Sequence, residues 1–280
     1  MLPSYVERME PFIINLYKGD IKLSDLASEA NVEPKASFGF VNDQGQSQDF
    51  FDSKKGNGTA LISITGPVTR YGGMCSYGTQ DFAAFIAQAN NDSKTHSIVL
   101  ILDTPGGSVN GTKLLADAIS ASKKPVLAHV RGMAASAGMW IGSAASEIYV
   151  EGDLSSVGSI GTMASWLNLK GYYEKEGAKI VEIYSRLSPD KNKDYRDAEN
   201  GDYTRVLDQL DTITKSFHAA VTAGRGDKLQ LDKENVLTGK MYFAADAMSF
   251  GLIDGVLNFE QTIARARELA AGNKPKKILV

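Results

Sequence analysis

The chain has 280 residues, 43% of them hydrophobic, which is enough to bury the core of one large domain or two small ones. Its formal net charge of −3 offers no broad positive field to nucleic acid and no basic face to anionic lipid, so we expect neither as a partner. The one cysteine, Cys75, rules out an internal disulfide, and the absence of any Cys/His cluster that could bind zinc fits a globular protein of a reducing compartment.

The segment 1–56 is predicted to form an N-terminal helical arm and linker ahead of the main domain. Residues 4–17 place apolar side chains at helical spacing, which predicts an amphipathic helix packed on the body or on a neighbouring copy. Charged residues in its first turns interrupt any apolar run, so we expect no signal peptide or membrane anchor. Residues 37–58 are rich in Gly, Asn, Asp, Ser and Gln and are typical of a loop or linker, which puts the boundary near Asn57.

From there on, strand-like and helix-like segments alternate. The apolar runs "ALISITGPV", "SIVLILDT", "PVLAHV" and "EIYVE" read as strands. The segments between them, "TQDFAAFIAQANND", "GTKLLADAIS" and "SAGMWIGSAA", carry the helical pattern. This alternation predicts an α/β domain with a largely parallel sheet covered by helices.

The pattern changes after the last of these strands. It predicts a helix at "WLNLKGYYEKEG", a strand at "AKIVEIYS" and a long amphipathic helix from about Tyr203 to Ala223. We take 57–258 as the main domain and 259–280 as a C-terminal helix, over 259–271, with a basic tail. The apolar end of that tail, "KPKKILV", could occupy its own or a neighbour's cleft, an idea that truncation after Asn273 would test.

The stretch "ILDTPGGSVNG" joins a predicted strand to a predicted helix through Gly106 and Gly107. Paired glycines leave backbone N–H groups bare, and beside a helix N-terminus such groups can bind a phosphate or the oxyanion of an acyl-transfer intermediate. The alternative is a tight β-α turn that needs positive φ. Neither the P-loop nor the dinucleotide-binding glycine motif is present, so nucleotide binding has no specific support.

The stretch "GMAASAGMW" places Ser136 among small residues at a predicted strand-to-helix turn. A hydroxyl at such a turn is exposed and lies near helix N–H groups, as a nucleophile requires, with the N–H of Ala137 able to join that of Gly107 around an oxyanion. The alternative is an ordinary helix N-cap, for which serine is favoured.

A nucleophilic serine needs a base, and none of the three histidines, His96, His129 and His218, is well placed in the sequence. The other base available to serine is a lysine whose pKa is lowered by burial in a shielded cleft. The segment "YSRLSPDKNKDYRD" offers Lys191 and Lys193, although its charges by themselves describe a solvated loop.

Taken together, these motifs resemble the signal peptide peptidase A type serine peptidases and their phage and prophage relatives. The resemblance rests on motifs that occur in the family's order across roughly residues 58–258. They are "DTPGG" at Asp103 to Gly107, "GMAASAG" at Gly132 to Gly138, "SEIYVE", "GSIG" at Gly158 to Gly161, a lysine followed by aspartate, and a Gly, Ala and "GLID" pattern from Gly239 to Asp254.

The resemblance implies a role for each site residue. The nucleophile would be Ser136, the general base Lys193 with Lys191 as the fallback, and Ser159 a second serine that steadies the lysine amine. The N–H groups of Gly107 and Ala137 would form the oxyanion hole, Gly106 and Gly132 would bind substrate, and no metal or organic cofactor is implied. The small residues around Ser136 would let a substrate backbone approach and suggest small apolar side chains near the scissile bond.

The fold implied is that of the Clp protease proteolytic subunit and the crotonases, in which repeated ββα units build a sheet with helices outside. Members form ring-like or dome-like homo-oligomers that cut polypeptides, and single-domain relatives take the serine and the lysine of one site from adjacent subunits. Because no N-terminal anchor is expected, a cytoplasmic phage or prophage capsid-assembly (head maturation) protease, associated with the procapsid, is favoured over a soluble peptidase that degrades signal or other peptides.

Two alternatives come from other classes. A crotonase-like acyl-CoA enzyme would need oxyanion N–H groups and a carboxylate, not a serine with a lysine. A non-catalytic assembly protein would be expected to have lost the serine or the lysine, and both are present.

Overall fold

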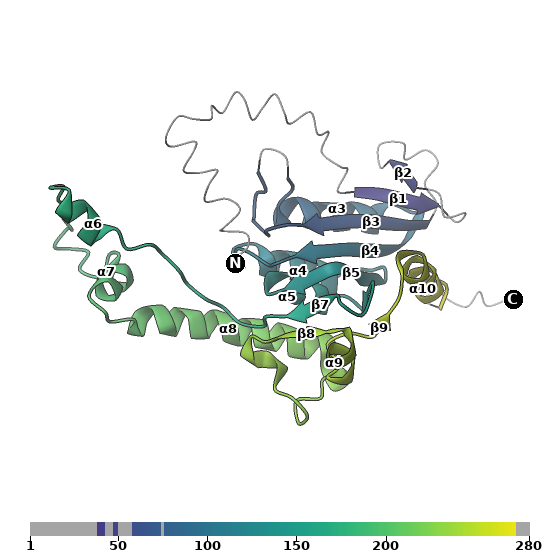
Figure 1. The fold of residues 1–280 in the computed structure, drawn as a ribbon. Coiled ribbons are helices and arrows are strands. Elements are labelled where there is room, and N and C mark those ends of the chain that lie inside the picture. The colour runs from purple at the N-terminus through teal and green to yellow at the C-terminus, as the bar shows by residue number, and fades with distance from the viewer. Residues whose placement is uncertain (1–37, 43–46, 50–57, 74–75, 273–280) are drawn as a thin grey trace, which may run out of the picture.

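The computed structural model describes residues 38–42, 47–49, 58–73 and 76–272. The expected N-terminal helix, Cys75 and the apolar tail lie outside the described residues. Figure 1 shows two parts: a body built around a sheet, and an extension, residues 163–203, that reaches away from it.

The predicted parallel sheet is confirmed as the centre of the body. Its described strands follow the order β2-β1-β3-β4-β5-β6-β9, with β7 paired to β5 and β8 paired to β7. Strands β3 to β6 and β9 run parallel, whereas β1, β2 and β8 pair antiparallel. The strands span Phe38–Asn42 (β1), Ser47–Asp49 (β2), Gly58–Thr65 (β3), Thr95–Thr104 (β4), Val126–Ala135 (β5), Glu147–Val150 (β6), Ser156–Gly158 (β7), Met241–Phe243 (β8) and Gly255–Val256 (β9).

The expectation of a loop or linker throughout residues 37–58 was wrong for β1 and β2. Strand β1 pairs along its whole length with β3, so the sheet begins before Asn57. Local composition missed β1 because the hydrogen bonds of a strand are supplied by its neighbours, here β2 and β3, and its own sequence need not be apolar. The domain boundaries themselves stay predictions.

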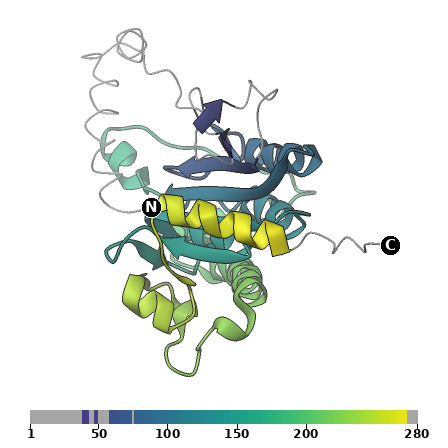
Figure 2. The ribbon, with the colours of Figure 1, turned by 90° about the vertical axis from the view of Figure 1, so that its right-hand side faces the viewer.

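Helices cover both faces of the sheet. On β4, Leu100 and Leu102 face a large core with α3 (Thr79–Asn91), α4 (Thr112–Ser120) and α5 (Ala137–Ser143), while Val99 and Ile101 face α10 (Phe259–Gly272). Neighbouring residues of a strand point to opposite faces, so a strand covered on both sides reads as the continuous apolar run seen in the sequence. Figure 2 shows α10 lying across the sheet, which confirms the predicted C-terminal helix.

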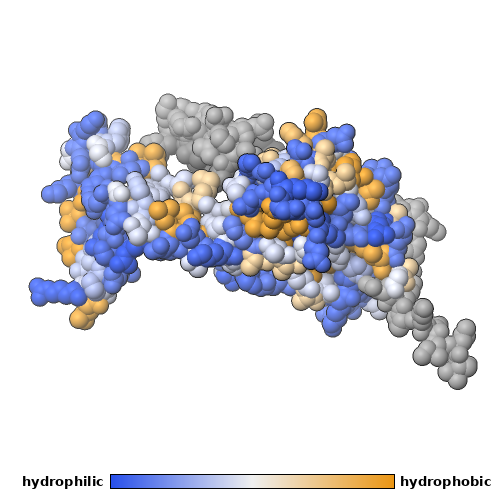
Figure 3. Space-filling view, turned by 90° about the horizontal axis from the view of Figure 1, so that it is seen from below, coloured by the Kyte–Doolittle hydropathy of each residue, from blue (hydrophilic) through white to orange (hydrophobic). Residues whose placement is uncertain are grey.

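The extension departs from the prediction. It holds only α6 (Lys170–Lys175) and α7 (Lys193–Glu199), and the expected strand at residues 178–185 pairs with no strand of the described chain. Its apolar side chains are instead exposed, Ile183 at 91% and Val181 at 70%. A strand needs a neighbour to satisfy its backbone groups, and the described part of a single chain supplies none here. Apolar patches on the extension are visible in Figure 3.

Helix α8 (Thr204–Arg225) connects the extension to the body, as the predicted long helix. Its C-terminal end is fixed: a Cβ on Gly224 would lie 1.9 Å from the carbonyl oxygen of Ser143, so the backbones of α8 and α5 touch. Beyond it, the buried Arg225 donates hydrogen bonds to the Gly251 carbonyl and, at 2.8 Å, to Asp254. Burial by itself would raise the pKa of Asp254, but hydrogen bonds from Arg225, Lys228 and a backbone N–H hold it below its ordinary value.

The remaining short helix of the body, α9 (Ala244–Ser249), packs next to β7 and β8. No helix in the described residues is long and apolar enough to cross a membrane.

Candidate active site

Ser136 stands at the junction between β5 and α5, in a backbone conformation that few residues other than glycine adopt. Its φ is 52° and its ψ is −117°, and a strained conformation of this kind persists only where the surroundings enforce it. Its N–H donates to the carbonyl of Gly158 at 2.9 Å and its C=O accepts from Trp140 at 3.0 Å. The side chain makes no capping hydrogen bond, so the N-cap alternative does not account for this serine.

Two backbone N–H groups lie beside it. Val68 donates to the Gly106 carbonyl at 2.9 Å and accepts from the Ser108 N–H at 2.8 Å. Gly107 lies between the two residues that bond Val68 in this parallel bridge. Its own N–H therefore points to the opposite side, away from Val68. Ala137 is the first residue of α5, and its N–H therefore has no partner within the helix.

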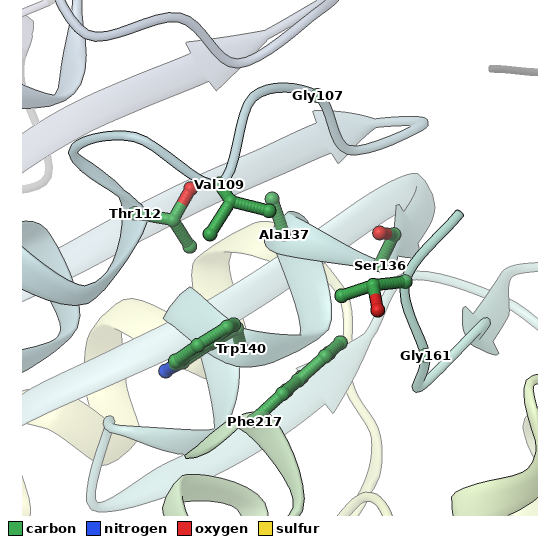
Figure 4. Close-up of a pocket in the computed structure, with 9 residues that line it drawn as sticks. Gly107, Val109, Thr112, Ser136, Ala137, Trp140, Gly161 and Phe217 are labelled. Carbon is green, nitrogen blue, oxygen red and sulfur yellow. The ribbon is translucent and has the colours of Figure 1, made fainter. Parts of the chain in front are cut away.

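Gly107, Ser136 and Ala137 line one cavity, drawn in Figure 4. A hydroxyl flanked by two backbone N–H donors is the arrangement that an oxyanion hole requires. None of the residues that line this cavity carries a carboxylate, which removes the feature that the acyl-CoA alternative needs.

The two glycines predicted to bind substrate allow close packing, Gly106 against Ser136 and Gly132 against Asp103. A Cβ on Gly106, whose φ is 93°, would lie 2.7 Å from the Cβ of Ser136. A Cβ on Gly132 would lie 2.9 Å from Oδ1 of Asp103, which accepts a hydrogen bond from the Met133 N–H. The tight-turn reading therefore holds for Gly106, and a substrate contact of either glycine stays a prediction.

Ser159 lies next to Ser136 across the sheet. Strands β5 and β7 run parallel with Ala135 opposite Gly158, so the two serines directly follow paired residues, and strands are about 4.8 Å apart. Ser159 has the same φ of 52° as Ser136, and its N–H donates to the Lys240 carbonyl at 2.8 Å. The fold thus brings together the two serines that the sequence analysis named.

Lys193 is not near them in the same chain. It begins α7, and its Nζ lies 3.0 Å from the carboxylate of Asp197, which Arg205 of α8 also approaches. Phe217, which lines the cavity, lies twelve residues further along α8, or about 18 Å at 1.5 Å per residue. Lys191 is exposed two residues before Lys193 on the same extension. Figure 1 shows α7 at the far end of α8 from α5.

None of the three histidines, His96 included, lines the cavity. His129 is buried and bonds Thr262 of α10 at 2.9 Å, and it precedes Ser136 by seven residues on β5, about 23 Å of extended chain. Desolvation by burial lowers the pKa of His129. The described residues hold no cluster of His, Cys, Asp or Glu that could bind a metal ion.

Comparison with known proteins identifies the family. Residues 118–273, more than half of the chain, match the model of peptidase family S49, and residues 72–149 match that of Clp protease. The chain belongs to peptidase family S49. The resemblance noted in the sequence is thereby confirmed, as is the Clp protease type of fold.

This S49 chain is similar to proteins from two phages and a plant. Capsid assembly protease C of Escherichia phage lambda is 31% identical over 220 residues, 77% of this chain and 48% of that protein. Head-tail preconnector protein GP5 of Enterobacteria phage P21 is 28% identical over 215 residues, 74% and 42% respectively. The chloroplastic serine protease SPPA of Arabidopsis thaliana is 26% identical over 227 residues, 79% and 32%. The chain spans half or less of the length of these relatives.

Sequence reasoning missed most of the cavity wall in this S49 chain. Trp140 and Phe217 stack in parallel with ring centroids 4.7 Å apart. Trp140 was visible in the motif, but Phe217 comes from a distant helix, and no local signal distinguishes it from other core aromatics. The lining residues that were not predicted are Val109, Thr112, Trp140, Gly161, Thr162 and Phe217.

Proposed function

We propose that this chain is a serine endopeptidase whose active site is completed between two copies. Ser136 of one copy is the nucleophile, the N–H groups of Gly107 and Ala137 hold the oxyanion, and Lys193 of a neighbouring copy is the general base. The observation that carries the proposal is the geometry of Ser136: a strained turn, a side chain not used as a cap, and two N–H donors in the same cavity.

The chemistry follows from these groups. The neutral amine of Lys193 takes the hydroxyl proton of Ser136 as Oγ bonds to the peptide carbonyl carbon, and the two N–H groups hold the negative oxygen. The C–N bond then breaks as the lysine ammonium gives its proton to the leaving amine. Water, losing a proton to the same lysine, attacks the acyl-enzyme, and Ser136 recovers its proton when the acid leaves. Ser159, next to Ser136, would hold the amine in place.

The interchain arrangement is supported by the position of Lys193. Within one chain its side chain is paired with Asp197 of α7 on the extension (Figure 1), out of hydrogen-bond reach of the Ser136 hydroxyl whose proton a base must take. The proposal requires that assembly move it into a neighbour's cavity, away from Asp197 and from water. The exposed apolar side chains of the extension that carries Lys193, such as Ile183 and Leu187 at 91% and 94%, suit burial against another copy.

The proposed substrates are the structural proteins of a phage or prophage head, cut during capsid assembly in the cytoplasm. Support comes from the similarity to the two phage proteins, whose names refer to capsid assembly and to the head-tail preconnector. A peptidase that degrades signal or other peptides is the second candidate, favoured by the similarity to the SPPA protease.

The test is hydrolysis of casein and of fluorogenic peptides by the wild type, Ser136→Ala, Lys193→Ala and a refolded equimolar mixture of the two variants. Each variant alone should lose at least about 10⁴-fold in rate. The mixture should recover up to about a quarter of wild-type activity, since one random neighbour pair in four joins an intact serine to an intact lysine.

Three outcomes would contradict parts of the proposal. Full activity of Ser136→Ala would remove the peptidase mechanism. If Lys193→Ala stayed active while Ser136→Ala did not, Lys191 would become the candidate base. Two inactive variants whose mixture stays inactive, while both assemble, would place the serine and the lysine in the same chain.

A further inference from the structure

The cavity beside Ser136 is small. The space inside it that a water-sized sphere can reach is about 10 Å³, close to the least that holds a single water molecule. A methyl group is of similar size, whereas a leucine or phenylalanine side chain is several times larger. As it stands, the cavity has room for one carbon atom and little more.

Two stacked rings close it. Trp140 follows Ser136 by one helical turn, and its N–H bonds the Ser136 carbonyl. Phe217 lies parallel to it with an angle of 9° between the rings, and both are almost fully buried, at 3% and 1% exposed. Figure 4 shows the pair below Ser136, opposite Val109 and Thr112.

The two helices that carry these rings, α8 and α5, are themselves held in place. Phe217 belongs to the half of α8 whose backbone touches α5 at Gly224 and whose end is held by the buried Arg225. Trp140 belongs to the fully buried α5. Close-packed interiors yield little to an oversized group, so a larger side chain cannot enter at low cost.

The surroundings are also apolar in effect. The Thr112 hydroxyl donates to the Ser108 carbonyl at 2.7 Å, and the Thr162 hydroxyl bonds the Leu210 carbonyl and Thr214. Figure 4 draws the indole nitrogen of Trp140 at the end of the ring away from Ser136. The two threonine hydroxyls therefore have their protons engaged within the chain, and they offer a substrate hydroxyl no donor that a methyl group would forgo.

We infer that this cavity receives the substrate side chain on the acyl side of the scissile bond, and that the stacked Trp140–Phe217 pair restricts that residue to alanine or a residue of similar size. The inference rests on the proposed function. The attacked carbonyl carbon is bonded to the Cα of that residue. Since Ser136, Gly107 and Ala137 line the cavity and also hold that carbonyl, the side chain on that Cα is the one brought to its mouth.

The experiment measures kcat/KM for fluorogenic peptides that differ only at the residue before the scissile bond, with Gly, Ala, Ser, Leu or Phe there. For the wild type we expect Ala to be cleaved best and Leu and Phe to fall by roughly 10- to 200-fold, the discrimination that a tight apolar pocket achieves. In Phe217→Ala the removed ring opens the cavity, so the ratio of Leu to Ala should rise at least about tenfold.

Phe217→Leu keeps more of the packing and should shift the ratio in the same direction, in case the alanine variant does not fold. The matched control is Val221→Ala, one turn further along α8, which removes an equally buried side chain that does not line the cavity. It should keep the wild-type order of peptides.

A wild type that cleaves the Leu and Phe peptides as fast as the Ala peptide overturns the inference and leaves the proposed function standing. So does a folded Phe217→Leu or Phe217→Ala variant that keeps the wild-type order. A folded, assembled wild type that cleaves none of the peptides and no casein overturns the proposed function, and the inference with it.

Discussion

The body and the extension use apolar residues in opposite ways. In the body, the long apolar strands β4 and β5 are covered on both faces, and Leu100 and Leu127 are fully buried. In the extension, apolar side chains are displayed, and Leu187 is 94% exposed. Monomeric proteins rarely expose many large apolar groups together. The body therefore completes its own core within one chain, whereas the extension leaves large apolar side chains uncovered in the single chain.

The same division runs through the active site. Ser136, Ser159 and the two N–H donors belong to the body, and backbone hydrogen bonds within one chain fix them. Lys193 belongs to the extension. Under the proposed function, the groups that need precise geometry are preorganised in the body, whereas the base would come from the extension of another copy and would depend on assembly.

The largest expected effect is a loss of stability of the body. Asp254→Ala should lower the free energy of unfolding by about 3–5 kcal/mol, because it leaves the buried Arg225 guanidinium without its carboxylate. Urea unfolding followed by circular dichroism measures this loss. Asp211→Ala, an exposed position on α8, is the control and should change it by less than about 0.5 kcal/mol. A loss below about 1 kcal/mol for Asp254→Ala would show that the ion pair does not hold α8 to the body.

The next prediction concerns the rate of the reaction and not the stability of the body. A Cβ on Gly107 would lie 2.1 Å from the Val68 carbonyl oxygen, so Gly107→Ala must displace this N–H from the oxyanion site. We expect kcat to fall by about 10²–10³-fold in peptide hydrolysis. Gly152→Ala adds a methyl group where no atom lies within 4 Å and should leave kcat unchanged. A Gly107→Ala enzyme within threefold of wild type would mean that this donor is not used.

The third prediction addresses the extension. Ile183→Glu places a charge on a side chain that is 91% exposed in one chain, so the chain should fold normally and its melting temperature should change by no more than about 2 °C. Assembly, followed by analytical ultracentrifugation, should be lost, and peptide hydrolysis with it. Leu154→Glu, on an 83% exposed side chain of the body, is the control. If the control dissociates the oligomer and Ile183→Glu does not, the interface lies on the body.

The smallest effect is a change in pH dependence. Because the folded pKa of Asp254 lies below its ordinary value of 3.8, its stabilisation is fully present above that value and is lost as pH falls through the folded pKa. The free energy of unfolding, measured between pH 5 and pH 3, should fall with pH. The free energy of unfolding of Asp254→Asn should fall less steeply over the same range. An equal slope in both proteins would assign the acid sensitivity to other carboxylates.

The sequence predicts what is local and periodic in this molecule. The alternating apolar runs predicted the parallel sheet, and the small residues around Ser136 predicted the strand-to-helix turn, because both are set by neighbours in the chain. Phe217 could not be predicted as a cavity wall, since its place depends on how α8 packs on α5. The strand expected at 178–185 failed for a related reason: its apolar pattern is real, but a strand forms only with a partner, and the described part of one chain provides none.

Helix α8 is anchored to the body at its C-terminal end. The contact of Gly224 with Ser143 and the ion pair of Arg225 fix this end. Near its other end, Arg205 pairs with Asp197, the partner of Lys193. A tilt of 5° about Phe217 would move that other end by about 1.6 Å over a length of about 18 Å. A displacement of about 1 Å can already cost a hundredfold in rate. If Lys193 serves a neighbouring copy as proposed, the orientation of α8 would therefore limit how accurately the lysine is placed.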